Sequence, residues 1–189
     1  KTRSVNEGNC FMTGPFTFNF LLEYMGKLGK DNTFIIIDPS LNRIRKLKKY
    51  LSSRNYTFIF VVGKPEDIPI KHKTVDFYID DYSTVNSLFT YNHFATDQIA
   101  PLLKKGAEVV GIFTSYKNAP KSIFNFKKDH PDFSPEKMTF AGLKHHWALE
   151  NVKITEVKNV GKTTPGEIHF PQNAPGEVIE VYGYHAVKT

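Results

Sequence analysis

The chain has 189 residues, of which 40% are hydrophobic, and it carries a formal net charge of +6. This length suits one domain with a sizeable core, and no apolar run approaches the roughly 18 to 20 residues of a membrane-spanning helix. We expect no signal peptide and a reducing, cytoplasmic setting, because the N-terminus lacks an apolar segment and Cys10 is the single cysteine.

Strand-length apolar runs alternate with helix-length segments over the first two thirds of the chain. The expected strands are 4–12, 33–38, 56–62, 74–80 and 106–114, and the expected helices are 15–29, 40–55 and 84–103. Pro15 suits a first helical turn, and Ser40 suits an N-cap. The run TFIIID at 33–38 is apolar up to its final acid, which is typical of a strand buried on both faces of a parallel sheet.

The last third of the chain has a different pattern. Short helices are expected at 134–138 and 139–151, and strands at 152–160 and 177–187. No helix separates these two strands, so an antiparallel hairpin is the natural connection. The order of elements predicts an α/β fold, a three-layer sandwich around a seven-stranded, mostly parallel sheet with one antiparallel strand.

Acidic residues follow several of the expected strands. They are Asp38 after the second, Glu66 and Asp67 after the third, and Asp80 and Asp81, with Tyr82, after the fourth. Ligands of parallel sheets bind at this carboxyl edge, where an acid after the second strand accepts hydrogen bonds from ribose hydroxyls. An acid after the third strand is placed to accept from an adenine amino group. Each acid taken alone is equally consistent with a helix cap or a turn.

Three segments and the terminal hairpin resemble the class I S-adenosylmethionine-dependent methyltransferases, type 11-like. The segments are TFIIIDPS (33–40), GKPEDIPI (63–70) before TVDFYID, and PLLKKGAEVVGIF (101–113). The resemblance covers nearly the whole chain. It implies a Rossmann-like domain over 1–189, with a cofactor-binding half at 1–114 and C-terminal helices and a hairpin at 115–189. It also implies S-adenosylmethionine as cofactor and an unknown, small-molecule methyl acceptor.

The same resemblance assigns residues to the cofactor. These are Glu7, Gly8, Gly14, Asp38, Pro39, Glu66, Asp67 and Asp80. The family's first loop is an acid followed by three alternating glycines, whereas this chain has NCFMT between Gly8 and Gly14. Phe11 and Met12 stand where the family presents bare backbone to the cofactor. We therefore expect residues 6–20 to form either a rebuilt cofactor loop or a filled pocket.

Candidate catalytic residues follow the fourth strand. Asp80 or Asp81 is placed to deprotonate an acceptor, and Tyr82 to orient it. A metal site is not expected, because the adjacent His145 and His146 point apart on a helix and the chain offers no Cys/His set.

A non-catalytic, ligand-sensing or regulatory domain on the same scaffold is the alternative function. The segments VNEGNCFMTG, VDFYIDDYSTVN and FPQNAPGE resemble methyltransferase-like domains that follow MerR-type DNA-binding modules in bacterial regulators, and the missing initiator methionine fits an excised domain of that kind. The expected partners are then a small-molecule substrate or effector, nucleic acid only through such a fused module, no membrane, and a second copy in a homodimer.

Overall fold

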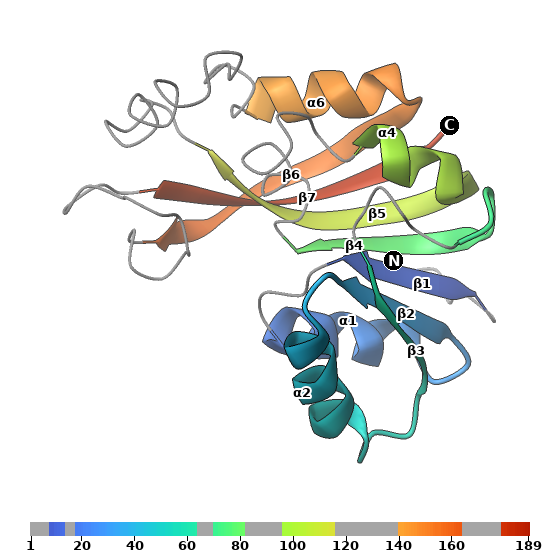
Figure 1. Cartoon of the computed structure of the whole chain (residues 1–189). Coiled ribbons are helices and arrows are strands. Elements are labelled where there is room, and N and C mark those ends of the chain that lie inside the picture. The colour runs from blue at the N-terminus through green and yellow to red at the C-terminus, as the bar shows by residue number, and fades with distance from the viewer. Residues whose placement is uncertain (1–7, 14–17, 64–69, 82–95, 116–139, 164–178) are drawn as a thin grey trace, which may run out of the picture.

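A computed structural model of the chain describes residues 8–13, 18–63, 70–81, 96–115, 140–163 and 179–189. Its strands are β1 (Asn9–Thr13), β2 (Thr33–Asp38), β3 (Thr57–Val62), β4 (Val75–Asp81), β5 (Leu103–Ser115), β6 (Val152–Thr163) and β7 (Ile179–Lys188). Its helices are α1 (Phe18–Leu28), α2 (Leu41–Leu51), α4 (Thr96–Ile99) and α6 (Phe140–Leu149), with a 3₁₀ helix at Ala100–Leu102. The strands form one sheet with helices on both faces (Figure 1).

The strand order of the sheet is β3-β2-β1-β4-β5-β7-β6. β1 to β5 pair in parallel, whereas β7 is antiparallel to both of its neighbours, β5 and β6. This arrangement confirms the predicted seven-stranded, mostly parallel sheet, its one antiparallel strand and the terminal hairpin. The chain reverses its direction of progress along the sheet between β1 and β4, which are neighbours although β2 and β3 lie between them in sequence.

Two apolar layers, one on each face of the sheet, make this a three-layer fold. On one face α1 and α2 pack against the sheet through buried side chains that include Leu21, Met25, Ile44, Leu47, Phe34 and Phe77. On the other face α4 and α6 do so through Ile99, Leu143, Trp147, Tyr78, Val109 and Phe113. Each large apolar side chain so buried stabilises the fold by about 1.5–3 kcal/mol.

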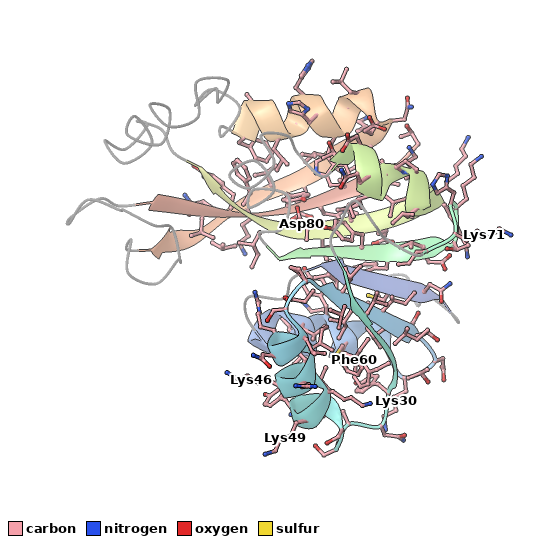
Figure 2. All side chains as sticks on the ribbon, viewed as in Figure 1. Lys30, Lys46, Lys49, Phe60, Lys71 and Asp80 are labelled. Carbon is pink, nitrogen blue, oxygen red and sulfur yellow. The ribbon has the colours of Figure 1, made fainter. Side chains whose placement is uncertain are left out.

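Helix α2 illustrates how the sequence pattern produces this packing. Its apolar residues recur at helical spacing, so Ile44, Leu47 and Leu51 are buried against the sheet. Lys46 and Lys49 project away from the sheet (Figure 2). Ser40 is the N-cap, as predicted, and its hydroxyl accepts a hydrogen bond from the Arg43 backbone N–H at 3.3 Å.

Some predicted boundaries were wrong. β1 occupies 9–13 instead of 4–12, so NCFMT is the strand and not the loop that follows it. β5 begins at Leu103, three residues early, and its pairing with β4 is irregular around Gly106, whose φ of +82° suits glycine. The C-terminal part of the helix expected at 84–103 is instead α4 followed by the 3₁₀ helix that holds Pro101. The helix expected at 134–138 lies outside the described residues.

Within the described residues, no helix is both long and apolar enough to cross a membrane.

Candidate functional site

The candidate site lies at the carboxyl edge of the sheet, around the end of β1. Thr13, the last residue of β1, pairs with Ile37 of β2 on one side and with Asp80 of β4 on the other. Asp38 follows Ile37 directly, so Asp38 and Asp80 flank the end of β1 on either side. The spacing between strands separates their backbones by about 10 Å. This position is the point of strand-order reversal where open α/β sheets bind ligands.

Asp38 is buried at the end of β2, with 1% of its surface exposed. Its Oδ1 accepts a hydrogen bond from the Ser40 backbone N–H at 2.7 Å, and its backbone carbonyl accepts one from the Gly63 N–H at 3.2 Å. The carboxylate is therefore held by the first residues leading into α2 and the backbone by the end of β3. Pro39, between Asp38 and Ser40, is exposed.

The second carboxylate oxygen of Asp38 is different. Oδ2 lies 3.3 Å from the Arg43 Nε, an ion pair that lacks the geometry of a hydrogen bond, and no described residue donates a hydrogen bond to it. A buried acceptor without a donor costs about 1–3 kcal/mol. Such an atom is rare in folded proteins and requires an explanation. A ligand hydroxyl at this position would satisfy Oδ2.

Asp80 is equally buried, but its carboxylate has a protein partner on the opposite face of the sheet. The Tyr184 hydroxyl of β7 donates to Asp80 Oδ2 at 2.5 Å, and the Trp147 indole N–H of α6 donates to the Tyr184 oxygen at 3.3 Å. Burial, followed by the adjacent Asp80 charge, raises the pKa of Tyr184 well above its usual value. The phenol therefore stays protonated and remains a donor at any physiological pH. Asp80 is labelled within the sheet, on its α6 side, in Figure 2.

Gly111 makes the contact between Tyr184 and Asp80 sterically possible. β5 separates β7 from β4, and Gly111 of β5 pairs with both Tyr184 and Asp80. A Cβ atom at Gly111 would lie 2.4 to 2.7 Å from three atoms of the Tyr184 side chain. The tyrosine ring thus crosses β5 directly over a residue that has no side chain.

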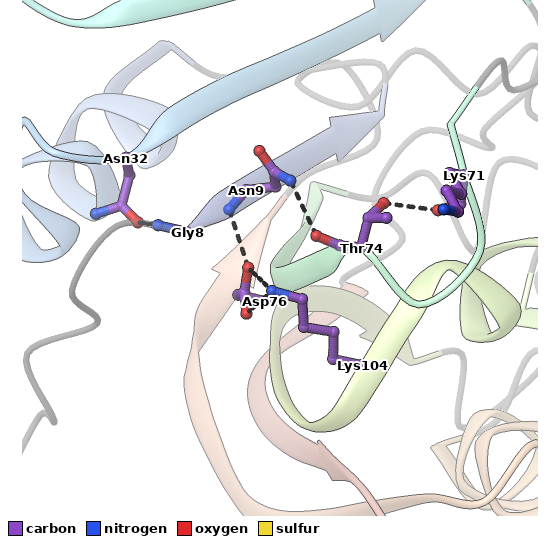
Figure 3. A network of polar contacts seen from close by, with 7 residues as sticks. All are labelled: Gly8, Asn9, Asn32, Lys71, Thr74, Asp76 and Lys104. Carbon is purple, nitrogen blue, oxygen red and sulfur yellow. Dashed lines mark hydrogen bonds and ion pairs between the residues drawn. The ribbon is translucent and has the colours of Figure 1, made fainter.

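Gly8 lies away from Asp38 and Asp80. It precedes β1, at the amino edge of the sheet, where its N–H donates to Asn32 Oδ1 at 3.1 Å (Figure 3). Its carbonyl accepts a hydrogen bond from the Thr33 N–H. A Cβ at Gly8 would lie 3.2 Å from atoms of Asn32 and Asp76. The structure therefore places Gly8 at the opposite edge of the sheet from Asp38 and Asp80, where close packing accounts for the glycine.

The polar residues of the amino edge form a network of their own (Figure 3). Asp76 Oδ2 accepts from the Asn9 N–H at 3.1 Å, and both Asp76 oxygens accept from Lys104 Nζ at 2.7 and 2.9 Å. Asn9 Nδ2 donates to the Thr74 carbonyl, and Asn32 Nδ2 donates to the Leu28 carbonyl. These contacts fasten the start of β1 between β2 and β4.

Several predicted site residues cannot be placed. Glu7, Gly14, Glu66, Asp67 and Tyr82 lie outside the described residues. The backbone of Asp81 is described as the last residue of β4 and pairs with Ile112. Within the described residues, no three His, Cys, Asp or Glu side chains are close enough together to hold a metal ion.

The sequence interpretation missed the contribution of Tyr184, Trp147 and Gly111. One signal was present, because an isolated glycine inside an apolar strand pattern indicates a close approach by another group. Nothing in the sequence identified Tyr184 as that group, since it lies 73 residues further along the chain.

Comparison with known proteins was informative only for structure. No protein-family model and no curated protein matches the sequence. A SAM-dependent methyltransferase from Methanosarcina mazei is 15% identical with a TM-score of 0.66, covering 98% of this chain and 94% of that chain. A SAM-dependent methyltransferase from Aquifex aeolicus is 13% identical with a TM-score of 0.62, covering 99% and 85%.

A geranyl diphosphate methyltransferase, solved in complex with SAM, has a TM-score of 0.66 at 12% identity, covering 98% of this chain and 80% of that chain. At such low identities these similarities establish the architecture. The strand order and the antiparallel β7 agree with that conclusion. The chain has the Rossmann-like fold of the class I S-adenosylmethionine-dependent methyltransferases.

Proposed function

We propose that this chain binds S-adenosylmethionine at the carboxyl edge of its sheet and transfers the methyl group to a small-molecule acceptor. Asp38 Oδ2, which pairs with the Arg43 charge but accepts no hydrogen bond from any described residue, carries the proposal. It is a buried acceptor at the end of β2, beside the reversal of strand order, and the hydroxyls of a ribose are donors that match it. The SAM-dependent neighbours in fold support the choice of nucleoside.

The proposed cofactor site contains further residues that end or follow strands in sequence. In addition to Asp38 we assign to it Pro39, Asp80, Gly14, Glu66 and Asp67, the last three of which lie outside the described residues. Pro39 and Ser40 lead into α2, and this short connection fixes the Asp38 carboxylate through the Ser40 N–H. Asp38 is thereby held in one orientation before any ligand arrives, which lowers the entropic cost of binding.

S-adenosylmethionine, when bound, supplies an electrophilic methyl group on a sulfonium. The protein's part is alignment of the acceptor and removal of its proton. We assign these roles to the end of β4, where Asp80 is buried and oriented by Tyr184. Asp81 and Tyr82, directly after it in sequence, are the other candidates for base and orienting group.

A ligand-sensing domain without catalysis is the second candidate function, and one observation favours it. Because NCFMT is a strand, only Gly14 remains between β1 and α1 where the family has three alternating glycines. Bare backbone for the methionine part of the cofactor is correspondingly reduced. In that case the domain would regulate a transcription factor as part of a MerR-type bacterial protein, as a homodimer, responding to a small effector.

Calorimetric titration with S-adenosylmethionine and S-adenosylhomocysteine tests the proposal. We expect micromolar binding, weakened about 10- to 100-fold in Asp38→Ala, which is the effect of losing charge-assisted hydrogen bonds. Asp97→Ala is the matched control, since it removes an exposed aspartate from α4 and leaves the site intact. Absence of binding at millimolar ligand, or equal affinity in the two variants, contradicts the proposal.

Transfer of a labelled methyl group separates the two candidate functions. Wild-type protein that binds the cofactor and methylates members of a small-molecule panel is an enzyme. Protein that binds the nucleoside with the Asp38 dependence described above, but transfers no label, has the sensing function. In both cases the binding site is the one proposed.

A further inference from the structure

Three hydrogen-bonded side chains connect the candidate site to the far end of the chain. Asp80 is the penultimate residue of β4, Trp147 lies near the C-terminal end of α6, and Tyr184 comes from β7. All three are buried, with exposed fractions of 1%, 0% and 4%. The Trp147 indole donates a hydrogen bond to the Tyr184 oxygen, and the Tyr184 hydroxyl donates one to the Asp80 carboxylate. We call these three side chains the series; its hydrogen bonds all point toward Asp80.

The packing around this series leaves Tyr184 little freedom. Gly111 provides the space for its ring, as described above, and the Trp147 ring packs edge-on against Tyr78 with centroids 6.4 Å apart. The ring of Tyr184 is therefore enclosed by β5 and α6. A hydroxyl in a buried, fixed ring can hold one oxygen of a carboxylate in a defined position, which a mobile or solvated partner cannot do.

The chemistry of Tyr184 excludes a role as proton acceptor. Burial and the Asp80 charge raise its pKa well above the usual value, so it enters any reaction already protonated and it donates. Its hydroxyl donates a hydrogen bond to Asp80 Oδ2 and accepts one from the Trp147 N–H. What it provides to the site is the orientation of Asp80.

We propose that Tyr184 is a positioning residue of the ligand site: it holds Asp80 for contact with the cofactor and acceptor, and it transmits occupancy of the site to Trp147. This inference rests on the proposed function. It assigns to the C-terminal hairpin, which is otherwise only a part of the sheet, a role in ligand binding that it exerts through Asp80. Because Trp147 is the only tryptophan in the chain, its fluorescence reports on the series alone.

The experiment titrates S-adenosylhomocysteine into wild type, Tyr184→Phe, Tyr182→Phe and Asp80→Asn while Trp147 emission is recorded. Tyr184→Phe keeps the ring and removes only the hydroxyl. Tyr182→Phe is the matched control, the same change two residues away on β7, at a ring that packs against Phe140. Affinity is measured independently by calorimetry, and folding by the thermal midpoint.

We expect saturable change of Trp147 emission in wild type and in Tyr182→Phe. In Tyr184→Phe we expect about tenfold weaker binding, the effect of one charge-assisted hydrogen bond, and loss of the emission response. The double variant Tyr184→Phe/Asp80→Asn is expected to bind no more weakly than Asp80→Asn alone, because Tyr184 acts through Asp80. A purely structural tyrosine would lower the thermal midpoint without this non-additivity in affinity.

The results distinguish the two proposals. If wild type binds the nucleoside and Tyr184→Phe matches Tyr182→Phe in both affinity and emission response, the positioning role is wrong while the proposed function stands. If wild type does not bind the nucleoside, both are wrong.

Discussion

The two edges of the sheet use the same side chain, aspartate, in different ways. At the amino edge, both carboxylate oxygens of Asp76 accept hydrogen bonds, from the Asn9 N–H and from Lys104. At the carboxyl edge, Asp38 uses one oxygen to accept from the Ser40 N–H, and no described residue donates a hydrogen bond to the other. Both aspartates lie beside β1, one at its start and one at its end.

The difference separates groups that stabilise the fold from groups available to a ligand. A buried polar group lowers the free energy of the folded state only when its hydrogen-bonding capacity is met. Asp76 meets this condition, and Asp38 meets it only in part. Asp80 is intermediate, since one of its oxygens accepts from Tyr184 while it stands at the same edge as Asp38. The carboxyl edge therefore contains one packed contact and one incompletely satisfied acid.

The largest effect is expected where the carboxyl edge is packed most tightly. Gly111→Ala places a methyl group within 2.4 to 2.7 Å of three atoms of the Tyr184 side chain, which is buried. We expect a loss of about 3 kcal/mol in the free energy of unfolding, the upper range for overpacking. Urea denaturation measures it.

A double variant tests the cause of that loss. Tyr184→Ala removes the ring, so adding Gly111→Ala to it is expected to cost less than about 1 kcal/mol. If Gly111→Ala lowers the free energy of unfolding equally with and without the Tyr184 ring, the glycine is required for another reason and not to accommodate Tyr184.

Asp76→Ala compared with Asp38→Ala tests the difference between the edges directly. We expect Asp76→Ala to lower the free energy of unfolding by about 2 kcal/mol, mostly through the stranded Asn9 N–H. The ion pair with Lys104 adds little, because that lysine is about half exposed. Asp38→Ala is expected to cost less than about 1 kcal/mol, because it removes an unsatisfied oxygen together with one hydrogen bond.

Ligand affinity is expected to show the reverse order. Asp76→Ala leaves nucleoside binding unchanged in calorimetry, whereas Asp38→Ala weakens it. Equal losses of stability in the two variants would show that the carboxyl edge is as structural as the amino edge.

The sequence was a good guide to whatever depends on local pattern. TFIIID at 33–38 became β2 without a change of boundary, because an unbroken apolar run is readable as a buried strand. β1 was less readable, since Cys10 owes its burial to neighbours from β2 and β4 and the strand is only five residues long. The strand begins five residues later than expected, so Gly8 precedes β1 at the amino edge of the sheet.

The candidate site followed the same rule. Asp38 and Asp80 were identifiable because each ends a strand expected from the sequence, and parallel strands end at the same edge. Tyr184 was not identifiable, because its contact with Asp80 depends on the order β4-β5-β7 and on the absence of a side chain at Gly111. Long-range contacts of this kind follow from the order of the strands in the sheet, which local sequence patterns do not reveal.

Alkaline pH is expected to weaken the packed part of the carboxyl edge. Since the pKa of Tyr184 is raised in the folded protein, the folded state holds a proton that the unfolded state releases above about pH 10. Stability therefore falls as pH rises beyond 10, by up to about 1.4 kcal/mol per pH unit for this one group.

Tyr184→Phe is the control for this pH dependence. Burial also raises the pKa of the Cys10 thiol, so wild type begins to lose stability above about pH 8.5 and only the part beyond pH 10 is expected to shrink in the variant. Identical pH profiles of wild type and Tyr184→Phe in chemical denaturation would mean that Tyr184 ionises in the folded state as readily as in the unfolded chain.

A small effect, confined to stability, is expected at Ser40, which lies close to Asp38 but stabilises the fold. Ser40→Ala removes the side-chain cap of α2 and leaves the backbone N–H that donates to Asp38 Oδ1. We expect a loss of about 1 kcal/mol in the free energy of unfolding and no change in nucleoside affinity. Asp38→Ala, only two positions away in sequence, is expected to weaken nucleoside affinity and to lower the free energy of unfolding less. A Ser40→Ala variant with weaker nucleoside affinity would place the Ser40 hydroxyl in the ligand site. The N-cap of α2 would then both stabilise the helix and bind the ligand, and ligand binding would not be confined to the edge of the sheet.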